Sequence, residues 1–269
     1  RFEYIFPNFN YEKYLYNENN LNGDLTFNTR GFQKNYNTNT DETILINDLK
    51  YSSFYNISPS INGLLTNYKL LLRNFNSSIE NSSRFQNGED HQLLSTVLLE
   101  NKLPLKKENK NSTSILTPKI SARYSPNSTK NNSNSGKRLT YENIFLLDRI
   151  DNTSVEGGES LTLGAEYSLT GKKNDKFISL SLANVLRKNE NLHLPKLYSF
   201  SEKRSDFIGE FNFVPSKFFD LNYQFSLDKD LARSNYNLIK TSFNINNFVT
   251  SFEFLEEDNY LSQESYLKN

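Results

Sequence analysis

The stretch from Phe219 to Asp228, FDLNYQFSLD, decides the fold because its side chains alternate strictly between two chemical types. One set is apolar: Phe219, Leu221, Tyr223, Phe225 and Leu227. The other set is polar: Asp220, Asn222, Gln224, Ser226 and Asp228. Alternation with a period of two places the sets on opposite faces of a β-strand. The stretch therefore predicts a β-strand with one apolar face and one polar face.

The same alternation recurs along the chain. Leu161 to Thr170 repeats it, with Leu161, Leu163, Ala165, Tyr167 and Leu169 opposed by Thr162, Gly164, Glu166, Ser168 and Thr170. Leu21 to Thr29 does so too, and weaker copies lie near Ile44, Leu64, Leu93, Ile115, Phe177, Phe207, Ile239 and Phe248. These runs last about nine to eleven residues, the length of a tilted strand that crosses a bilayer, whereas soluble strands average about five or six.

Turn residues separate the runs. Asn246-Asn247 predicts a two-residue hairpin turn, and Gly171 to Asp175 and Asp228 to Asp230 predict further tight turns. The longer polar stretches Lys106 to Ser114 and Pro126 to Lys137 predict surface loops. Short turns at one end and long loops at the other are typical of outer-membrane barrels. The pattern predicts an all-β fold, an antiparallel transmembrane β-barrel present in part, with about twelve strands of a larger barrel.

Composition narrows the class of protein. Lys+Arg and Asp+Glu both number 31 in the 269 residues, so no overall field recruits nucleic acid. Hydrophobic residues make up only 36%, but 21 Phe and 16 Tyr argue against disorder. No apolar run approaches the roughly 18 residues of a transmembrane helix. The alternative is a soluble, secreted β-sandwich or β-solenoid. Strand length, aromatic content and the polar face opposite each apolar face favour the membrane barrel.

Catalytic and metal-binding groups are not evident in the sequence. Cysteine is absent, which removes disulfides, cysteine metal sites and thiol nucleophiles. His91 and His193 have no carboxylate at metal-ligand spacing and are read as ordinary loop or lumen residues. The Gly157-Gly158 pair lacks the Lys-Ser/Thr of a phosphate loop. We therefore predict no catalytic residue, no metal, no cofactor and no enzyme activity.

Polar residues in two places are the candidate functional residues. Asp148, Arg149 and Glu156 form a charged loop directly before the regular strand that begins near Leu161, and an Arg between carboxylates at a strand end usually ties a loop to a barrel wall. The hydrated strand faces supply candidate lumen-facing residues. These are Asp220, Asn222, Gln224, Ser226, Thr162 and Glu166.

One segment and several ordered blocks resemble a known family. Asn143 to Tyr167, with Asp148-Arg149, Glu156-Gly157-Gly158 and Gly164-Ala165-Glu166-Tyr167, resembles a segment of the LptD (OstA) barrel family of lipopolysaccharide-assembly proteins. The other blocks, in family order, are Ile5-Phe6-Pro7-Asn8-Phe9, Leu21 to Leu25, Leu103-Pro104-Leu105, Leu116 to Lys119, Tyr124-Ser125-Pro126, Ser205 to Gly209 and Phe225 to Asp228.

The resemblance implies lipopolysaccharide transport and insertion into the outer leaflet of a bacterial outer membrane. A family member pairs a periplasmic β-jellyroll with a barrel of about twenty-six strands. Lipid passes through a gap between the first and last strands and sugar through the hydrated lumen, without a covalent step. The implied partners are lipopolysaccharide, outer-membrane lipids, an LptE-like plug lipoprotein and an LptA-like periplasmic bridge that meets the jellyroll. Nucleic acid is not among them.

The chain begins at Arg1 and contains no Met, so residues 1–269 are expected to be an internal piece of the barrel domain. The jellyroll and the terminal strands that form the lateral gate are expected to be missing. Three alternatives stay open. A porin or TonB-dependent receptor would share the strand pattern but lack the ordered blocks; an outer-membrane hydrolase needs a nucleophile or acid dyad; and a secreted adhesin would not fractionate with outer membranes.

Overall fold

The chain folds into antiparallel strands with almost no helix, as the alternation predicts. The computed structural model describes residues 3–15, 22–36, 39–58, 61–82, 87–133, 135–150, 153–172, 176–245, 248–259 and 264–268. The strands in these ranges are β1 (Tyr4–Tyr14), β2 (Gly23–Asn35), β3 (Asp41–Ser53), β4 (Asn56–Ile57), β5 (Leu65–Glu80), β6 (Gly88–Lys102), β7 (Leu105–Glu108), β8 (Ser112–Ser125), β9 (Gly158–Gly171), β10 (Phe177–Arg187), β11 (Phe207–Ser216), β12 (Phe219–Leu227), β13 (Ser234–Ile245), β14 (Phe248–Asn259) and β15 (Glu264–Lys268), with one 3-10 turn, η1 (Leu197–Ser199). Within the same ranges, no helical segment has the length and apolar character needed to span a bilayer.

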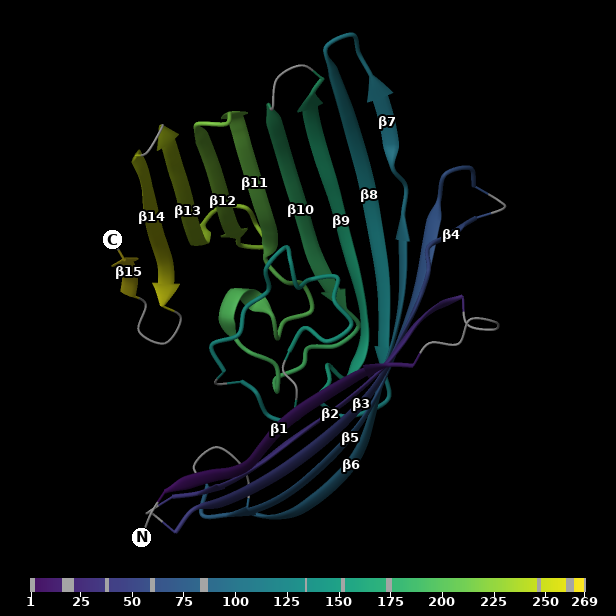
Figure 1. The fold of residues 1–269 in the computed structure, drawn as a ribbon, viewed down its shortest axis with the longest axis vertical. Coiled ribbons are helices and arrows are strands. Elements are labelled where there is room, and N and C mark those ends of the chain that lie inside the picture. Colours follow the sequence, from purple (N-terminus) through teal and green to yellow (C-terminus); the bar gives the residue numbers. More distant parts are fainter. Residues whose placement is uncertain are drawn as a thin grey trace.

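All strands belong to one sheet that follows the chain. Its order is β1-β2-β3-β5-β6-β8-β9-β10-β11-β12-β13-β14-β15, with β4 beside β5 and β7 beside β8. In the described residues this path holds thirteen strands, against the expected twelve. Figure 1 shows the sheet curving into a trough whose two walls are β1–β6, the first wall, and β8–β15, the second wall. The trough is not closed, because β1 and β15 are its two edges.

The two walls meet at a short ladder. β5 pairs with β6 along its whole length, from Leu65 to Ile79, but β6 pairs with β8 only from Val97 to Lys102. Beyond that point the side chain of Asn127 makes the hydrogen bonds to the β6 edge that a neighbouring strand would otherwise make. Its amide oxygen accepts from the Ser95 backbone N–H at 2.8 Å, and its amide nitrogen donates to the Leu93 carbonyl at 3.0 Å. The walls diverge from this junction (Figure 1).

The connections at the two ends of the sheet differ in length. Phe219 follows β11 after only two residues. The turns predicted at Asn246-Asn247 and from Gly171 to Asp175 fall on residues outside the described ranges, 246–247 and 173–175. The turn after Leu227 falls where the sequence predicted it, at the opposite end of the sheet. That end also carries two long connections, residues 126–157 between β8 and β9, here called inner loop 1, and residues 188–206 between β10 and β11, called inner loop 2. Both lie on the concave side of the sheet (Figure 1).

Only one of the two long polar stretches is the loop that the sequence predicted, with most of its described side chains exposed or half-buried. Residues 126–137 belong to inner loop 1 and fold back against the sheet, with Thr129 buried. Residues 106–114 extend the sheet, because β7 pairs with the start of β8 from Leu105↔Leu116 to Glu108↔Thr113. Polarity alone did not indicate that residues 106–114 are paired, because a hairpin can continue beyond the main sheet, or that the loop at residues 126–137 lies on the concave side.

The register keeps the two chemical faces separate from strand to strand. On the outward face, Ile120 of β8 lies opposite Leu163 of β9, and Leu116 lies opposite Tyr167, which in turn lies opposite Leu180 of β10. Ile120 and Leu163 are 40% and 38% exposed, as expected for apolar groups with no protein cover. The side chains between them point into the trough, where Thr162 contacts inner loop 1.

The strands of the first wall are longer than the sequence indicated. β5 has 16 residues and β6 has 15, where runs of about nine to eleven were expected. The outward face of β5 is apolar at Tyr68, Leu70 and Leu72 and becomes polar at Asn74 and Asn76. The additional residues therefore continue the sheet beyond the apolar band.

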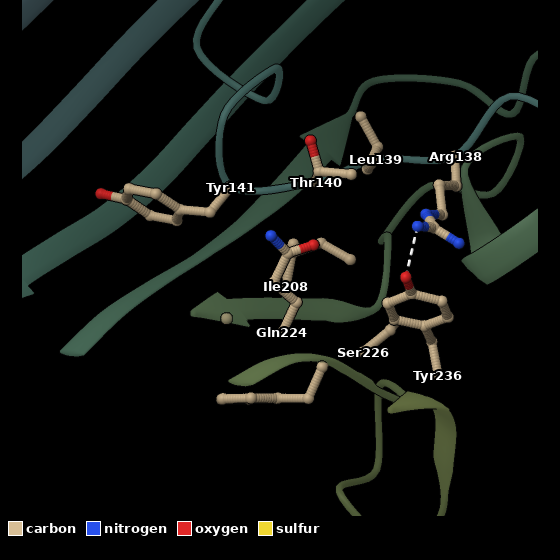
Figure 2. Close-up of a pocket in the computed structure, with 10 residues that line it drawn as sticks. Arg138, Leu139, Thr140, Tyr141, Ile208, Gln224, Ser226 and Tyr236 are labelled. Carbon is tan, nitrogen blue, oxygen red and sulfur yellow. Dashed lines mark hydrogen bonds between the residues drawn. The ribbon is translucent and has the colours of Figure 1, made fainter. Parts of the chain in front are cut away.

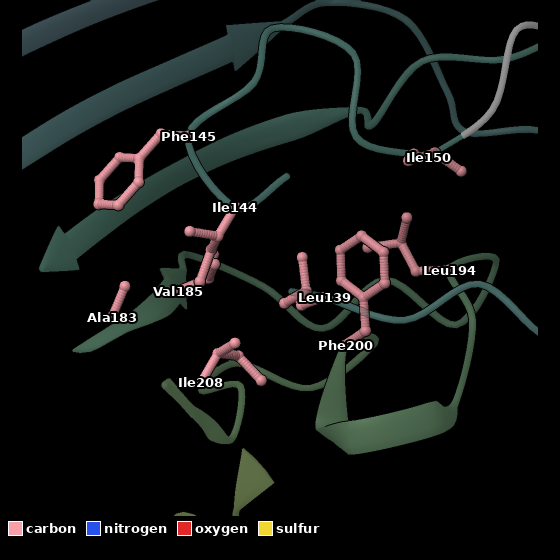
Figure 3. Packing of buried hydrophobic residues seen from close by; sticks show 9 residues of the cluster. All are labelled: Leu139, Ile144, Phe145, Ile150, Ala183, Val185, Leu194, Phe200 and Ile208. Carbon is pink, nitrogen blue, oxygen red and sulfur yellow. The ribbon is translucent and has the colours of Figure 1, made fainter. Parts of the chain in front are cut away.

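A hydrophobic cluster fixes the inner loops in the trough. It combines residues of both loops with β10 and β11: Leu139, Ile144, Phe145, Ile150, Ala183, Val185, Leu194, Phe200 and Ile208 (Figure 3). Leu194 and Phe200 are completely buried. Gly164 of β9 lets Phe145 approach the sheet, because a Cβ at this position would lie 2.7 Å from the Phe145 ring. The loops are thus packed as a small core and do not merely cover the sheet.

Candidate functional site

Arg149 of inner loop 1 is held by a buried carboxylate. Its Nε lies 2.6 Å from Glu156 Oε2 and its Nη2 lies 2.9 Å from Glu156 Oε1, a two-pronged pair with both side chains buried. Its Nη1 donates to the Ile144 carbonyl at 2.8 Å and to Thr162 Oγ1 at 3.1 Å. Arg149 therefore closes inner loop 1 on itself and joins it to β9.

Glu156 also binds Arg187 at the end of β10. Arg187 Nε donates to Glu156 Oε1 at 3.0 Å, and Arg187 is itself buried. Burial alone would raise the pKa of Glu156, but the Arg149 and Arg187 guanidinium groups outweigh it and lower the pKa below its ordinary value. The carboxylate consequently remains ionised and links two cations from different elements.

Asp148 reaches the opposite wall of the trough. Its Oδ2 lies 2.5 Å from Nη2 of Arg73 on β5, and Arg73 Nη1 donates to the Ser154 carbonyl at 2.9 Å. Arg73 is completely buried and also pairs with Asp48 of β3, with Nε 2.7 Å from Oδ1. Arg30 of β2 lies 3.1 Å from the same Asp48 carboxylate. Inner loop 1 is thus connected to the first wall as well as the second.

Sequence reasoning named the loop members of this network but missed the strand members. Arg149 pairs with Glu156, whereas Asp148 pairs with Arg73 of the first wall. Arg73, Asp48 and Arg187 were not singled out. Arg123 of β8 was missed as well, although it donates to the carbonyls of Leu146 and Leu147. Each missed Arg occupies an inward position of its strand, and a cation at such a position was the available signal.

The two candidate residues of β9 lie at different depths in the trough. Thr162 is buried beneath inner loop 1, where it accepts the hydrogen bond from Arg149. Glu166 lies at the margin of the loop, pairs with Lys119 of β8 and accepts a hydrogen bond from the Tyr141 hydroxyl at 2.9 Å. Only Glu166 borders the open part of the trough.

The candidates on β12 also divide between open and covered positions. Asp220 is exposed and accepts from Ser242, and Asn222 donates to Glu210 at 2.7 Å. Ser226 is buried and donates to Asp206 Oδ2 at 2.9 Å. Gln224 lies between them and lines a small pocket.

That pocket joins inner loop 1 to the second wall. Figure 2 shows Arg138 of the loop beside Tyr236 of β13, with the guanidinium 3.8 Å from the ring centre and a hydrogen bond to the hydroxyl. Gln224 and Ile208 lie nearby. The enclosed space is about 10 Å³, which is water-sized and too small for a ligand.

The part of the trough beyond the inner loops is lined by paired polar groups, and we call it the polar trough surface. On β5 and β6, Lys69 pairs with Glu100 at 2.8 Å, and Glu100 also accepts from the Tyr55 hydroxyl at 2.8 Å. The other members described above are Lys119, Glu166, Glu210, Asn222 and Asp220. Lys69 and Lys119 neutralise two of the four carboxylates named here, so this surface offers hydrogen bonds and carries a modest negative charge.

The histidines do not form a site. His91 is exposed on β6, with Nδ1 3.0 Å from Asn76 Oδ1, and His193 is exposed in inner loop 2. Across the part of the chain that the structure describes, no group of three or more His, Cys, Asp or Glu side chains is arranged to hold a metal ion.

Comparison with known proteins agrees with this architecture. No curated protein matches the chain. The family model for LptD, described as LPS transport system D, matches residues 4–268, which is nearly the whole chain. The ordered sequence blocks, the antiparallel sheet with an apolar outer face and this match all point the same way. The chain belongs to the LptD family of lipopolysaccharide (LPS) transport proteins.

Proposed function

We propose that this sheet forms part of the wall of an outer-membrane barrel that carries LPS and inserts it into the outer leaflet. The observation that carries the proposal is the separation of faces in one curved sheet. The outward face presents residues such as Leu116, Ile120 and Leu163, which favour contact with acyl chains. The concave face presents the polar trough surface.

The orientation of the sheet follows from the length of its connections. Barrels of the outer membrane place short turns on the periplasmic side and longer loops on the extracellular side. Inner loops 1 and 2 both leave the same end of the sheet. This long-loop end then faces the cell exterior, and the polar extension of β5 and β6 projects beyond the membrane on that side.

The inner loops and the polar trough surface take different parts in the proposed path. Asp148, Arg149 and Glu156 anchor inner loop 1 across the trough, so that the loops narrow the lumen near the exterior. Glu166, Asn222 and Asp220, on the open side of the loops, offer hydrogen bonds to the oligosaccharide of LPS. Hydrogen-bonding groups without a cluster of cations suit a sugar that must move on, because a strongly cationic lining would hold its phosphates.

The partners follow from the family. An LptE-like lipoprotein would occupy the lumen from the periplasmic side, where the trough is open and polar. An LptA-like bridge would deliver LPS to a jellyroll domain of the same protein. The path from bridge to leaflet needs no covalent step in the sheet.

Depletion of the full-length protein in cells tests this function. Newly made LPS should then accumulate on the periplasmic side, measured by surface labelling against total LPS. A photo-crosslinking residue at Asn222 should capture LPS, while one at the outward neighbour Leu221 should not capture its sugar. Unchanged surface LPS after depletion, together with passage of small solutes through the purified barrel, would instead indicate a porin.

A further inference from the structure

An open groove lies on the outward face of the second wall, away from the polar trough surface. Its volume is about 640 Å³. The groove is lined by Leu163 and Ala165 of β9, Leu182 and Leu186 of β10, Phe207 of β11, and Arg204 of inner loop 2. Apolar side chains make up most of its length, Asn184 of β10 also lines it, and Arg204 stands at one end. We call it the outer groove.

Backbone pairing turns Arg204 outward. Residues 203–205 continue along β10 beyond the last β10–β11 pair, Ala183↔Ile208, with the Arg187 N–H donating to the Lys203 carbonyl at 2.7 Å. Arg204 forms a bridge with Leu186 and therefore shares its outward face. The next residue, Ser205, is completely buried on the opposite side, where its hydroxyl accepts from the Val185 N–H at 2.9 Å.

Arg204 lacks a charge partner among the residues that the structure describes. Its side chain is exposed, and its guanidinium lies 4.9 Å from the centre of the Phe207 ring. Stacking on the aromatic ring leaves the guanidinium N–H groups directed away from it, open to an anion. The neighbouring Lys203 is also exposed but does not line the groove.

We propose that the outer groove binds an LPS molecule of the outer leaflet, with an acyl chain along the apolar lining and a lipid phosphate on Arg204. Guanidinium groups bind phosphate through two parallel hydrogen bonds, and an apolar groove next to the cation suits the attached chain. The choice of LPS rests on the proposed function, because that orientation puts Arg204 at the extracellular rim of the apolar band. Phosphate-bearing phospholipid of the inner leaflet would lie at the opposite end of the strands.

The test places a photo-crosslinking amino acid at Leu163, on the rim of the groove, in the full-length protein in cells. Irradiation should yield an LPS adduct. Arg204→Gln should reduce the adduct about tenfold or more, the loss expected for a charge-assisted hydrogen bond. Arg204→Lys should retain most of it, and the adjacent control Lys203→Gln should leave it unchanged. Ala165→Phe, which fills the groove, should also reduce the adduct.

Two results would overturn the proposal. One is an equal yield of LPS adduct in the Arg204→Gln and Lys203→Gln proteins. The other is a phospholipid adduct in place of an LPS adduct. Purified protein in phosphatidylglycerol vesicles, with and without added LPS, distinguishes the two lipids. If depletion left surface LPS unchanged while the Arg204-dependent adduct persisted, the proposed transport function would be wrong, but the proposed LPS site in the outer groove would still be supported. Loss of surface LPS on depletion, with no adduct at Leu163, would support transport and exclude the lipid site.

Discussion

At the scale of single residues, the Glu156 carboxylate compensates the charge of two buried guanidinium groups, those of Arg149 and Arg187. Removing one partner of a buried ion pair costs about 3–5 kcal/mol, because the remaining charge stays buried without compensation. Glu156→Gln leaves both Arg149 and Arg187 in that position. We expect it to lower the free energy of unfolding by about that amount, measured by urea titration of the refolded full-length barrel.

The matched control for this substitution is Glu159→Gln. Glu159 pairs with Lys188 at 3.0 Å, but both side chains are exposed. Exposed pairs contribute about 0–1 kcal/mol, so this substitution should have little effect on the free energy of unfolding. Equal losses for the two variants would contradict the dependence of the network on Glu156.

The lowered pKa of Glu156 also fixes a pH dependence. Its folded pKa lies below the unfolded value of about 4.3, so the stabilisation is fully present above that value and is lost as the pH falls through the folded pKa. The difference in free energy of unfolding between the wild type and Glu156→Gln should therefore stay constant from about pH 8 to about pH 5. A difference that shrank across this range would indicate that Glu156 is not held ionised.

The residue scale also shows where sequence reasoning succeeded and stopped. Arg149 and Glu156 are close in sequence, so their pairing could be predicted. Arg73 and Arg187 lie on strands far from this loop, and each looks like any polar residue in an alternating run. Their role depends on which strands face each other across the trough, which alternation does not determine.

At the scale of elements, the junction between β6 and β8 depends on the side chain of Asn127. Asn127→Ala removes its bonds to Ser95 and Leu93 and leaves backbone groups at the β6 edge unpaired. We expect a local loss of about 1–3 kcal/mol and faster hydrogen exchange at the Ser95 amide.

The control for the junction is Asn131→Ala. Asn131 is exposed, and its amide oxygen bonds only within its own turn, to Ser133. Hydrogen exchange at the Ser95 amide should be unchanged in this variant. If Asn127→Ala also left that exchange unchanged, the Asn127 side chain would not be what protects the β6 edge.

The element scale further separates what alternation predicts from what it leaves open. The alternation located the strands and both faces of β9 and β12, because successive side chains point to opposite faces that meet different surroundings. It underestimated β5 and β6, whose outward face turns polar while the ladder continues. It did not indicate that the expected loop at residues 126–137 lies on the concave side of the sheet, because a polar composition cannot distinguish bulk water from a polar concave face.

At the scale of the whole molecule, the outward face should tolerate charge poorly and the inward face well. Leu221 and Gln224 of β12 lie on opposite faces, with Leu221 outward and Gln224 opposite Glu210. A Lys on the lipid side of a barrel costs about 2–4 kcal/mol near the middle of the bilayer. Leu221 lies two residues from the start of β12, so Leu221→Lys should lower the stability of the barrel in lipid vesicles by up to about this amount, and Gln224→Lys by much less.

Similar stability of the Leu221→Lys and Gln224→Lys proteins in vesicles would argue against a lipid-facing outer surface. The same pair in detergent micelles serves as a control, because a micelle adapts more readily to a buried charge. The difference between the variants should be smaller there than in vesicles.

The curvature of the sheet and the position of the inner loops were beyond the reach of the sequence. Alternation predicts that strands pair in order, which the sheet order bears out. It does not predict that the two walls diverge at the β6–β8 junction or that the loops enter the trough. Both arise from contacts between distant segments, such as Arg73 with Asp148 and Phe145 with Gly164.

The attachment of inner loop 1 to both walls has a mechanical consequence. Asp148 binds β5 of one wall and Glu156 binds β10 of the other, with only seven intervening residues between them. The loop is thus a cross-link of fixed span, and spreading these walls apart requires buried ion pairs to break. Elastic deformation should concentrate away from these ion pairs, toward the edge strands β1 and β15. On the proposed function, the cross-linked part of the sheet would set the width of the lumen, and the edges could deform while lipopolysaccharide passes.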